Sequence, residues 1–210
     1  MDGVIVDTEP VHHFAFNEHF KELNIEVSPE MYASFTGNST KNVFEKLIQT
    51  FDLKEDIEVL INQKRHLFNQ AFDKKEDLFL LDGVLDLIKD LHKNGILLVL
   101  ASSSAKVTIE RIFNRFDLHQ YFSHIVSGED FPKSKPNPAI FNHSAFISNT
   151  NIENCIVIED STNGIKAAKS AGIFCVGYDS LNSKLQDYSL ADIIVKDFKE
   201  LNYSIIKNLV

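Results

Sequence analysis

The segment Ile-Leu-Leu-Val-Leu-Ala-Ser-Ser-Ser, residues 96–104, decides the fold class of this 210-residue chain. Its first six residues are continuously apolar, and Gly95 and Ser102 bound them. A short apolar run of this kind predicts a strand that is covered on both faces, as in a parallel sheet. Gly95 ends the helix that we expect from about 83 to 94, because glycine readily takes the left-handed conformation that closes a helix.

Helices and strands alternate after this segment. We expect helices at 106–116, 138–147 and about 163–170, and strands at 124–127, 155–158, 174–177 and 192–195. Such alternation requires right-handed crossovers between parallel strands. The sequence therefore predicts an α/β fold with a doubly wound, Rossmann-like parallel sheet.

Residues 12–76 have a different pattern of apolar residues. Apolar residues recur there at spacings of three and four, and no strand pattern is present. Ser28, Pro29 and Glu30 supply a capping residue, a proline suited to the first turn and an acid suited to the helix dipole. We predict an all-helical inserted domain at 12–76 and an α/β core domain formed by 1–11 and 77–210.

Composition limits the possible partners. The net charge of −9 argues against a general nucleic-acid binder, which usually carries a basic face. The sequence has neither a basic and apolar leader nor an apolar run of roughly 18 residues. Cys155 and Cys175 lie in apolar stretches and are expected to be free thiols. We expect a cytoplasmic protein without a membrane partner; the oligomeric state stays open, and a monomer is compatible with the sequence.

Polar residues stand where the expected strands end. Ligands of open parallel sheets bind beyond the carboxyl ends of the strands. Asp2 follows a very short first strand, Ser102 the second, and Glu159 and Asp160 a later one. Three carboxylates packed together would repel one another unless a cation lay between them, and oxygen ligands suit Mg²⁺. Capping of the next helix by Glu159 and Asp160 is the alternative for that pair.

Ser102, Ser103 and Lys135 suggest an anion site. Hydroxyl and backbone N–H groups between a strand and a helix can receive phosphate oxygens. Lys135 lies between Ser134 and Pro136, in a loop before a helix. The alternative for the serines is a helix cap. The alternative for Lys135 is a solvent-exposed side chain without a ligand.

Four motifs in order resemble those of the haloacid dehalogenase superfamily, in the subgroup with a helical cap that contains beta-phosphoglucomutase and sugar-phosphate phosphatases. Met-Asp-Gly-Val-Ile-Val-Asp, residues 1–7, matches the first motif, Asp-x-Asp-Gly-(Val/Thr)-x-x-Asp, from its x position onward. Ser102 matches the second motif, and Lys135 in Lys-Pro-Asn-Pro-Ala-Ile-Phe matches the third. Glu159, Asp160 and Ser161 match the fourth. The resemblance spans essentially the whole chain.

The resemblance implies roles for these residues. Asp2 would protonate the leaving oxygen, activate the attacking water or hydroxyl, and bind Mg²⁺ through its backbone carbonyl. Asp160 and Glu159 would complete the metal site. Ser102, Ser103 and Lys135 would bind the transferring phosphoryl group.

The resemblance also makes the helical insert a cap over the site. It implies that His12 helps the cap to close, and that Thr40, Lys41 and Lys64 are candidate substrate contacts. In beta-phosphoglucomutase the corresponding loop carries an arginine for the second phosphate. Thr40 stands near that position here, with Lys41 next to it, which weakens the mutase reading.

The nucleophilic aspartate of the first motif falls one position before Met1. We expect an apolar strand ending in that aspartate to precede Met1 in the natural protein, and the chain without it to be inactive. The leading hypothesis is a magnesium-dependent phosphatase that acts on a small phosphorylated metabolite, a sugar phosphate, through an aspartyl-phosphate. The alternatives are a beta-phosphoglucomutase and, if Met1 is the natural start, a catalytically inactive binding protein.

Overall fold

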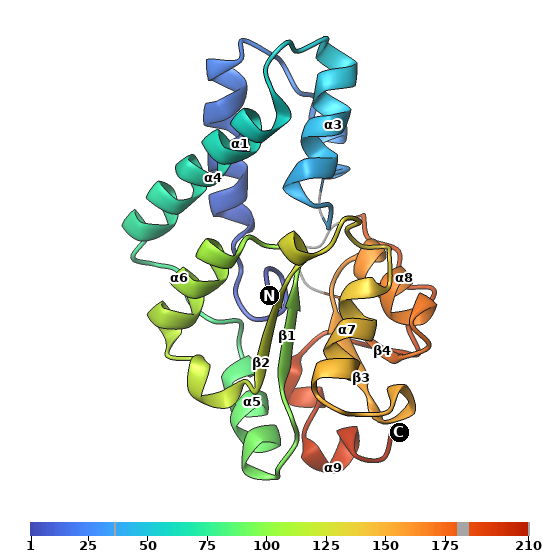
Figure 1. The fold of residues 1–210 in the computed structure, drawn as a ribbon. Coiled ribbons are helices and arrows are strands. Elements are labelled where there is room, and N and C mark those ends of the chain that lie inside the picture. The colour runs from blue at the N-terminus through green and yellow to red at the C-terminus, as the bar shows by residue number, and fades with distance from the viewer. Residues whose placement is uncertain (36, 180–184, 210) are drawn as a thin grey trace.

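Four helices near the N-terminus stand above a layered α/β unit in the computed structural model, which describes residues 1–35, 37–179 and 185–209 (Figure 1). The four are α1 (Glu9–Glu22), α2 (Pro29–Ala33), α3 (Thr40–Phe51) and α4 (Ile57–Lys74), and we call them the helical block. Thr36, which belongs to the loop expected before α3, lies outside the described residues. The helical character predicted for 12–76 is confirmed, while the division into two domains stays a prediction.

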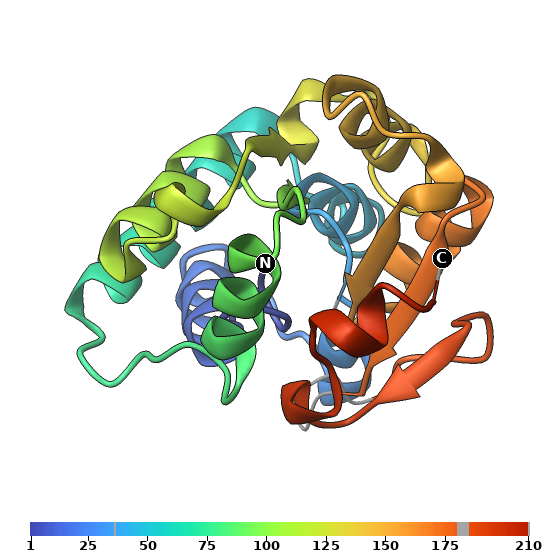
Figure 2. The same cartoon turned by 90° about the horizontal axis from the view of Figure 1, so that it is seen from below.

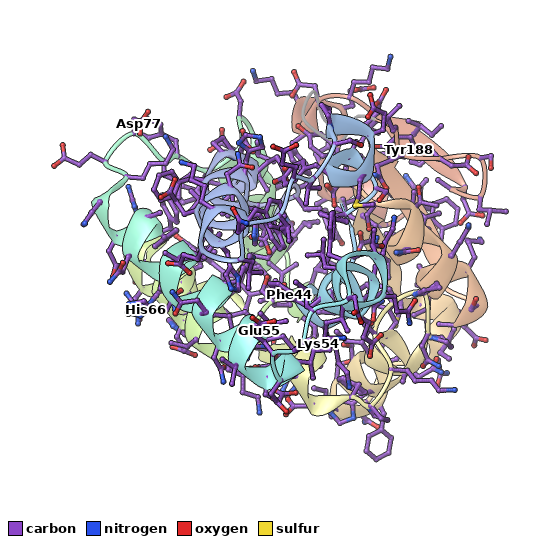
Figure 3. All side chains as sticks on the ribbon, turned by 90° about the horizontal axis from the view of Figure 1, so that it is seen from above. Phe44, Lys54, Glu55, His66, Asp77 and Tyr188 are labelled. Atoms are coloured by element: carbon purple, nitrogen blue, oxygen red, sulfur yellow. The ribbon has the colours of Figure 1, made fainter. Side chains whose placement is uncertain are left out.

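The helical block has a buried core of its own. Side chains from α1, α3 and α4 form it together with Phe35: Phe16, Phe20, Phe35, Phe44, Leu47 and Leu60. Figure 3 looks down on the block and shows Phe44 between the helices, whereas Lys54 and His66 lie on its outside. The side chain of Ser28 caps α2, as predicted, by accepting from the backbone N–H of Met31 at 3.2 Å.

The α/β unit contains the remaining elements. They are α5 (Val84–Lys93), β1 (Val99–Ser102), α6 (Lys106–Phe116), β2 (His124–Ser127), α7 (Ala139–Ile147), β3 (Ile156–Glu159), α8 (Thr162–Ser170), β4 (Phe174–Tyr178), β5 (Ile193–Val195) and α9 (Tyr203–Ile206), with short 3₁₀ turns between some of them. From α5 to β5 these elements follow the predicted order, whereas α9 was not predicted. Gly95 has a φ of +78° just beyond α5, as expected of a residue that closes a helix.

All strand pairs are parallel, but the strands form two sheets within the described parts of the chain. β1 pairs with β2, and β3 pairs with β4, which pairs with β5. The parallel pairing was predicted. Figure 2 shows the two groups of strands apart when the molecule is seen from below. The expected strand at 96–101 is shortened to Val99–Ser102, because 96–98 lie beyond the register with β2.

Helices cover both faces of these strands. On one face, α7 and α8 pack over Val126, Val157 and Cys175. On the other, α5 and α9 pack over Val176 and Val195, and α6 packs over Leu100. This doubly wound arrangement agrees with the prediction. No helix in the described residues has the length and apolar character needed to cross a membrane.

The first residues form a turn above the strand ends instead of a strand. The backbone N–H of Ile5 donates to the carbonyl of Met1 at 2.7 Å, and that of Gly3 donates to the carbonyl of Val6 at 2.9 Å. Gly3 has a φ of +72°, which a residue with a Cβ rarely adopts. The turn holds Asp2 beside the ends of β1 and β3.

Two arginines of α6 fasten the C-terminal end of α4 to the α/β unit. The Arg115 guanidinium donates to the carbonyl of Phe72 at 3.1 Å and to that of Lys75 at 2.5 Å. Arg111 forms an ion pair with Asp73. The Phe72 carbonyl also accepts from the capping backbone N–H of Lys75 at 3.2 Å, so Arg115 is its second partner.

Candidate active site

A cavity of about 150 Å³ lies between the carboxyl ends of the strands and the helical block. The strand ends and their loops contribute Asp2, Ser102, Ser103, Ser104, Lys135, Glu159 and Asp160 to its wall. The helical block and its loops contribute His12, Tyr32, Asn38, Ser39, Thr40 and Lys64. The cavity therefore brings together residues from all four sequence motifs and from the insert.

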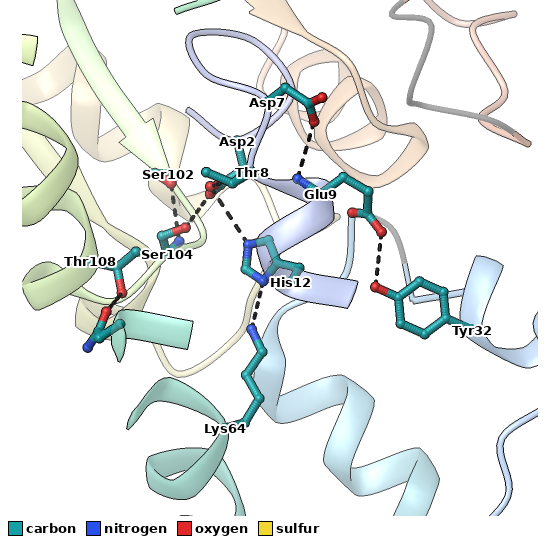
Figure 4. A network of polar contacts seen from close by, with 11 residues as sticks. Asp2, Asp7, Thr8, Glu9, His12, Tyr32, Lys64, Ser102, Ser104 and Thr108 are labelled. Atoms are coloured by element: carbon teal, nitrogen blue, oxygen red, sulfur yellow. Dashed lines mark hydrogen bonds and ion pairs between the residues drawn. The ribbon is translucent and has the colours of Figure 1, made fainter. Parts of the chain in front are cut away.

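Asp2 is held by two hydroxyl groups. The Ser104 hydroxyl donates to Oδ2 of Asp2, and the Thr8 hydroxyl donates to Oδ1, both at 2.5 Å (Figure 4). His12 Nε2 lies 3.8 Å from the same Oδ1. Burial tends to raise the pKa of Asp2, but the hydrogen bond and the charge of His12, with the Ser104 bond, outweigh it and hold the pKa well below its usual range. Asp2 is therefore ionised as a carboxylate.

His12 connects Asp2 to Lys64. The Lys64 ammonium lies 2.7 Å from Nδ1 of His12 and faces the rings of Phe16 and Phe68, at 4.6 and 5.2 Å from their centroids (Figure 4). Burial lowers the pKa of Lys64 to about 7, and burial also lowers the pKa of His12. An ammonium can only donate, so we assign the His12 proton to Nε2, which faces Asp2. The two residues expected at the cap thus form one chain of contacts with Asp2.

The residues expected to bind phosphate meet at the end of β1. Ser102 is buried, and its hydroxyl accepts from the backbone N–H of Ser104 at 3.1 Å. Lys135 is also buried; its ammonium donates to the carbonyl of Ala101 at 3.1 Å and forms an ion pair with Glu159. Burial raises the pKa of Glu159, but the charge of Lys135 and its hydrogen bond outweigh that effect and keep the pKa low. The alternative, a solvent-exposed Lys135, is therefore wrong.

The two acids after β3 lie against glycines. The Glu159 carboxylate occupies the space that a Cβ at Gly164 would need, and the Asp160 carboxylate occupies the space that a Cβ at Gly3 would need. Ser161 caps α8 by accepting from the backbone N–H of Gly164 at 3.1 Å. Helix capping thus falls to Ser161, not to the acidic pair.

The donor set is suited to magnesium, but its side chains do not converge. Asp2, Glu159 and Asp160 offer only oxygen ligands, which Mg²⁺ prefers. However, within 1–35, 37–179 and 185–209 no three His, Cys, Asp or Glu side chains gather closely enough to hold a metal ion. Asp2 is bonded to hydroxyls and Glu159 to Lys135. A metal role for these residues therefore stays a prediction.

The substrate-side residues divide into two groups. Thr40 lines the cavity at the start of α3, where Ser39 caps the helix by accepting from the backbone N–H of Asn42 at 3.2 Å. Lys41 is exposed and does not line the cavity. At this end of the cavity a bound molecule would therefore meet the Thr40 hydroxyl and not the Lys41 ammonium.

Sequence reasoning missed several residues of this wall. Thr8 and Ser104 hold Asp2, and each is adjacent to a quoted motif, so hydroxyl residues near the motifs could have been included. Tyr32 donates to the Glu9 carboxylate at 3.0 Å, across 23 positions in the sequence. No local pattern signals that contact.

Comparison with known proteins links this geometry to a family. Residues 1–178 match the family described as haloacid dehalogenase-like hydrolase. The chain is 28% identical to the beta-phosphoglucomutase of Bacillus subtilis over 211 residues, covering 98% of this chain and 91% of that protein. It is also 28% identical to a phosphorylated carbohydrates phosphatase of Thermotoga maritima over 178 residues, covering 82% and 79%.

A solved structure gives the same picture. The crystal structure of CbbY from Rhodobacter sphaeroides in complex with phosphate superposes with a TM-score of 0.84 at 26% identity, covering 96% of this chain and 93% of that one. The likeness covers the helical block as well as the α/β unit, because it includes nearly all residues of both chains.

Proposed function

Because the chain belongs to the haloacid dehalogenase-like hydrolase family, we propose that it transfers a phosphoryl group from a small phosphorylated metabolite, a sugar phosphate, to water. The observation that carries this proposal is the cavity in which Asp2, Ser102, Lys135 and the Glu159–Asp160 pair meet. The relatives of this chain include a beta-phosphoglucomutase and a phosphorylated carbohydrates phosphatase, and this supports a phosphorylated sugar as the substrate class.

The proposed reaction has two proton steps, and both use Asp2. A nucleophilic aspartate attacks phosphorus, and Asp2 protonates the oxygen that leaves. Asp2 then takes a proton from the water that attacks the aspartyl-phosphate. The contacts of Asp2 with His12 and Ser104 lower its pKa, so they keep Asp2 in the ionised form that the second step requires. The attacking aspartate belongs to the position immediately before Met1, so the chemistry requires an aspartate joined there.

The remaining residues orient the phosphoryl group and balance its charge. Ser102, Ser103 and Lys135 stand at one end of the cavity, where a hydroxyl and an ammonium can meet phosphate oxygens. Glu159 and Asp160 would hold magnesium. When bound, that ion would supply positive charge beside the developing negative charge.

The distal end of the cavity favours hydrolysis over mutase chemistry. Asn38, Ser39 and Thr40 line that end, whereas Lys41 points elsewhere. A mutase acting through a bisphosphate needs donors for a second phosphate, and these neutral side chains fit sugar hydroxyls better. The similarity to a beta-phosphoglucomutase keeps mutase activity as the second candidate.

A panel of sugar phosphates tests the proposal. Two proteins are compared. In one, a designed apolar segment that ends in aspartate precedes Met1; in the other, asparagine replaces that aspartate. We expect the aspartate protein to release inorganic phosphate with magnesium and to stop when the metal is chelated, and the asparagine protein to release none. Conversion of a sugar phosphate to its isomer without phosphate release would favour the mutase. No turnover of any panel member by the aspartate protein would contradict both.

A further inference from the structure

The first turn of α6 is capped from a distant part of the chain. Its N-cap residue is Ala105, whose side chain cannot accept a hydrogen bond. Instead, Oε2 of Glu129, in the 3₁₀ turn Gly128–Asp130, accepts from the backbone N–H of Lys106 at 2.8 Å. A carboxylate suits this position because the amino end of a helix carries partial positive charge. Glu129 thus fixes the start of α6 across 23 positions in the sequence.

The other oxygen of the same carboxylate holds the helical block. Oε1 of Glu129 lies 2.8 Å from Nη1 of Arg65, in the middle of α4, and Figure 1 shows α4 above α6. The side chains of Arg65 and Glu129 are 29% and 32% exposed. We call Arg65, Glu129 and the backbone N–H of Lys106 the brace. Its two ends belong to different parts of the fold, so it joins the block to the α/β unit.

The α/β end of the brace supports the Ser102–Ser104 loop, which ends where α6 begins. The Ser127 hydroxyl donates to the carbonyl of Ser104 at 2.7 Å, and it accepts from the backbone N–H of Glu129 at 3.2 Å. The same loop holds Asp2 through the Ser104 hydroxyl. The position of Glu129 therefore bears on the position of one group that holds Asp2.

The block end of the brace stands next to Lys64. The Lys64 ammonium lies 2.7 Å from His12, which lies 3.8 Å from Asp2. Consecutive residues of a helix point about 100° apart, so Lys64 can face His12 while Arg65 faces Glu129. Asp2 therefore has contacts on two sides, one leading to the loop and one leading to α4. The brace connects the two elements that supply them.

We propose that Arg65 and Glu129 are positioning residues: their ion pair sets α4 relative to the Ser102–Ser104 loop, so that His12 and Ser104 hold Asp2 at the same time. Neither is among the described residues that line the active-site cavity, so both act through other residues. The effect on catalysis rests on the proposed function, whereas the brace itself does not.

Substitutions in the aspartate protein of the phosphatase test separate the two ends of the brace. Arg65→Met removes the block end. Glu129→Gln weakens the same end, while its amide oxygen can still accept from the backbone N–H of Lys106. Glu129→Ala removes both ends. Lys106→Met is the matched control, because it breaks a neighbouring ion pair, with Asp130, that does not reach the block.

We expect Arg65→Met and Glu129→Gln each to lower kcat for phosphate release by about two- to fivefold, since exposed ion pairs shift equilibria on that scale. The double variant should lose no more than either alone, and Arg65→Lys, which keeps the charge, should recover part of kcat. The Kd of inorganic phosphate should stay unchanged in these variants and rise in Glu129→Ala. Additive losses, an equal loss in Lys106→Met, or weaker phosphate binding in Arg65→Met would overturn the proposal.

Measurements without turnover separate the brace from the proposed function. In the 210-residue chain, hydrogen exchange at the Lys106 amide should be at least about tenfold faster in Glu129→Ala than in Glu129→Gln. Urea unfolding of Arg65→Met, Glu129→Gln and the double variant should show coupling between the two residues. Coupling without phosphate release by the aspartate protein would retain the brace and reject the proposed function. Phosphate release without coupling would reject the brace and retain the function.

Discussion

Two cavities in the described part of the chain share Met1 and Glu159 but differ in their lining: the active-site cavity and a cavity of about 460 Å³ between the two sheets. In the active-site cavity, side chains bond to one another: Asp2 to Ser104, and His12 to Lys64. The cavity between the sheets is lined mainly by apolar residues, and one edge each of β1 and β3 has no partner strand among the described residues. A side chain can turn toward a partner, whereas a strand edge needs another strand at a fixed spacing. Local adjustment can complete the first cavity but cannot complete the second.

The largest effect should come from removing the proton acceptor of the polar cavity. In the aspartate-extended chain, Asp2→Asn should lower phosphate release by about 10²–10⁴-fold, because proton transfer contributes on that scale. The amide oxygen can accept from one of the two hydroxyls, and the amide N–H can donate to the oxygen of the other, so the unfolding midpoint should change little. Asp7→Asn, at a second acid of the same wall, is the matched control and should cost much less. Equal losses in the two variants would contradict the role of Asp2.

Breaking the ion pair between Lys135 and Glu159 should have the next largest effect. Lys135→Met leaves the buried Glu159 carboxylate without its cation, which should cost about 3–5 kcal/mol of unfolding free energy. Adding Glu159→Gln should recover most of that loss. Urea unfolding of the two single variants and the double variant measures the coupling, and simple additivity would show that the pair is not coupled.

The contact chain through Lys64 should appear as a pH dependence. The pKa of Lys64 is lowered from 10.5 to about 7 on folding, so the unfolded chain binds more protons between those values. The unfolding free energy should therefore rise with pH across that window, with a slope approaching about 1.4 kcal/mol per pH unit.

Lys64→Met should remove this contribution and stabilise the protein most near and below pH 7. Lys41→Met, at an exposed lysine outside the cavity, should leave the pH dependence as it is. Denaturant titrations at several pH values provide the measurement. An unchanged slope in Lys64→Met would show that other groups cause it.

The smallest predicted effect concerns the Ser104 hydroxyl, which donates a hydrogen bond to Asp2. Ser104→Ala removes one hydrogen bond worth about 1 kcal/mol, which should raise the pKa of Asp2 and move the acid limb of the pH–rate profile to higher pH. Ser103→Ala should leave that limb in place, because no hydrogen bond joins Ser103 to Asp2 in the described residues. A shift in Ser103→Ala as large as that in Ser104→Ala would refute the assignment.

The sequence predicted those parts of the fold that depend on local pattern. The helix at 106–116 and the strand at 124–127 have the predicted bounds, because apolar periodicity and short apolar runs specify them directly. The interruption between β1 and β3 depends on which strands become neighbours in space, which no local pattern specifies. The shortening of β1 has the same origin, because β2 alone sets its register.

The site was predicted as a set of strand-end residues, and the cavity contains all of that set. Its connections were less predictable. His12 and Lys64 were separate candidates, yet one hydrogen bond joins them across 52 positions. Lys41 was selected for its charge next to Thr40, but helical geometry turns the two in different directions once Ser39 begins α3. Such contacts follow from tertiary packing, which no motif encodes.

The arginine contacts at the end of α4 have a mechanical consequence. Arg111 and Arg115 make a charged hinge there, and Arg65 in the middle of α4 adds an ion pair with Glu129. The loop before α3, the latch, touches the α/β unit through neutral hydrogen bonds: Ser39 donates to Ser134 and Asn163 donates to Asn38, each at 3.2 Å. The latch is thus weaker than the hinge. Because α4 has 18 residues, it is a lever about 27 Å long, and a rotation of about 10° at the hinge displaces its far end by about 5 Å. Such a rotation also requires the Arg65–Glu129 ion pair to open, and it would widen the active-site cavity on the latch side.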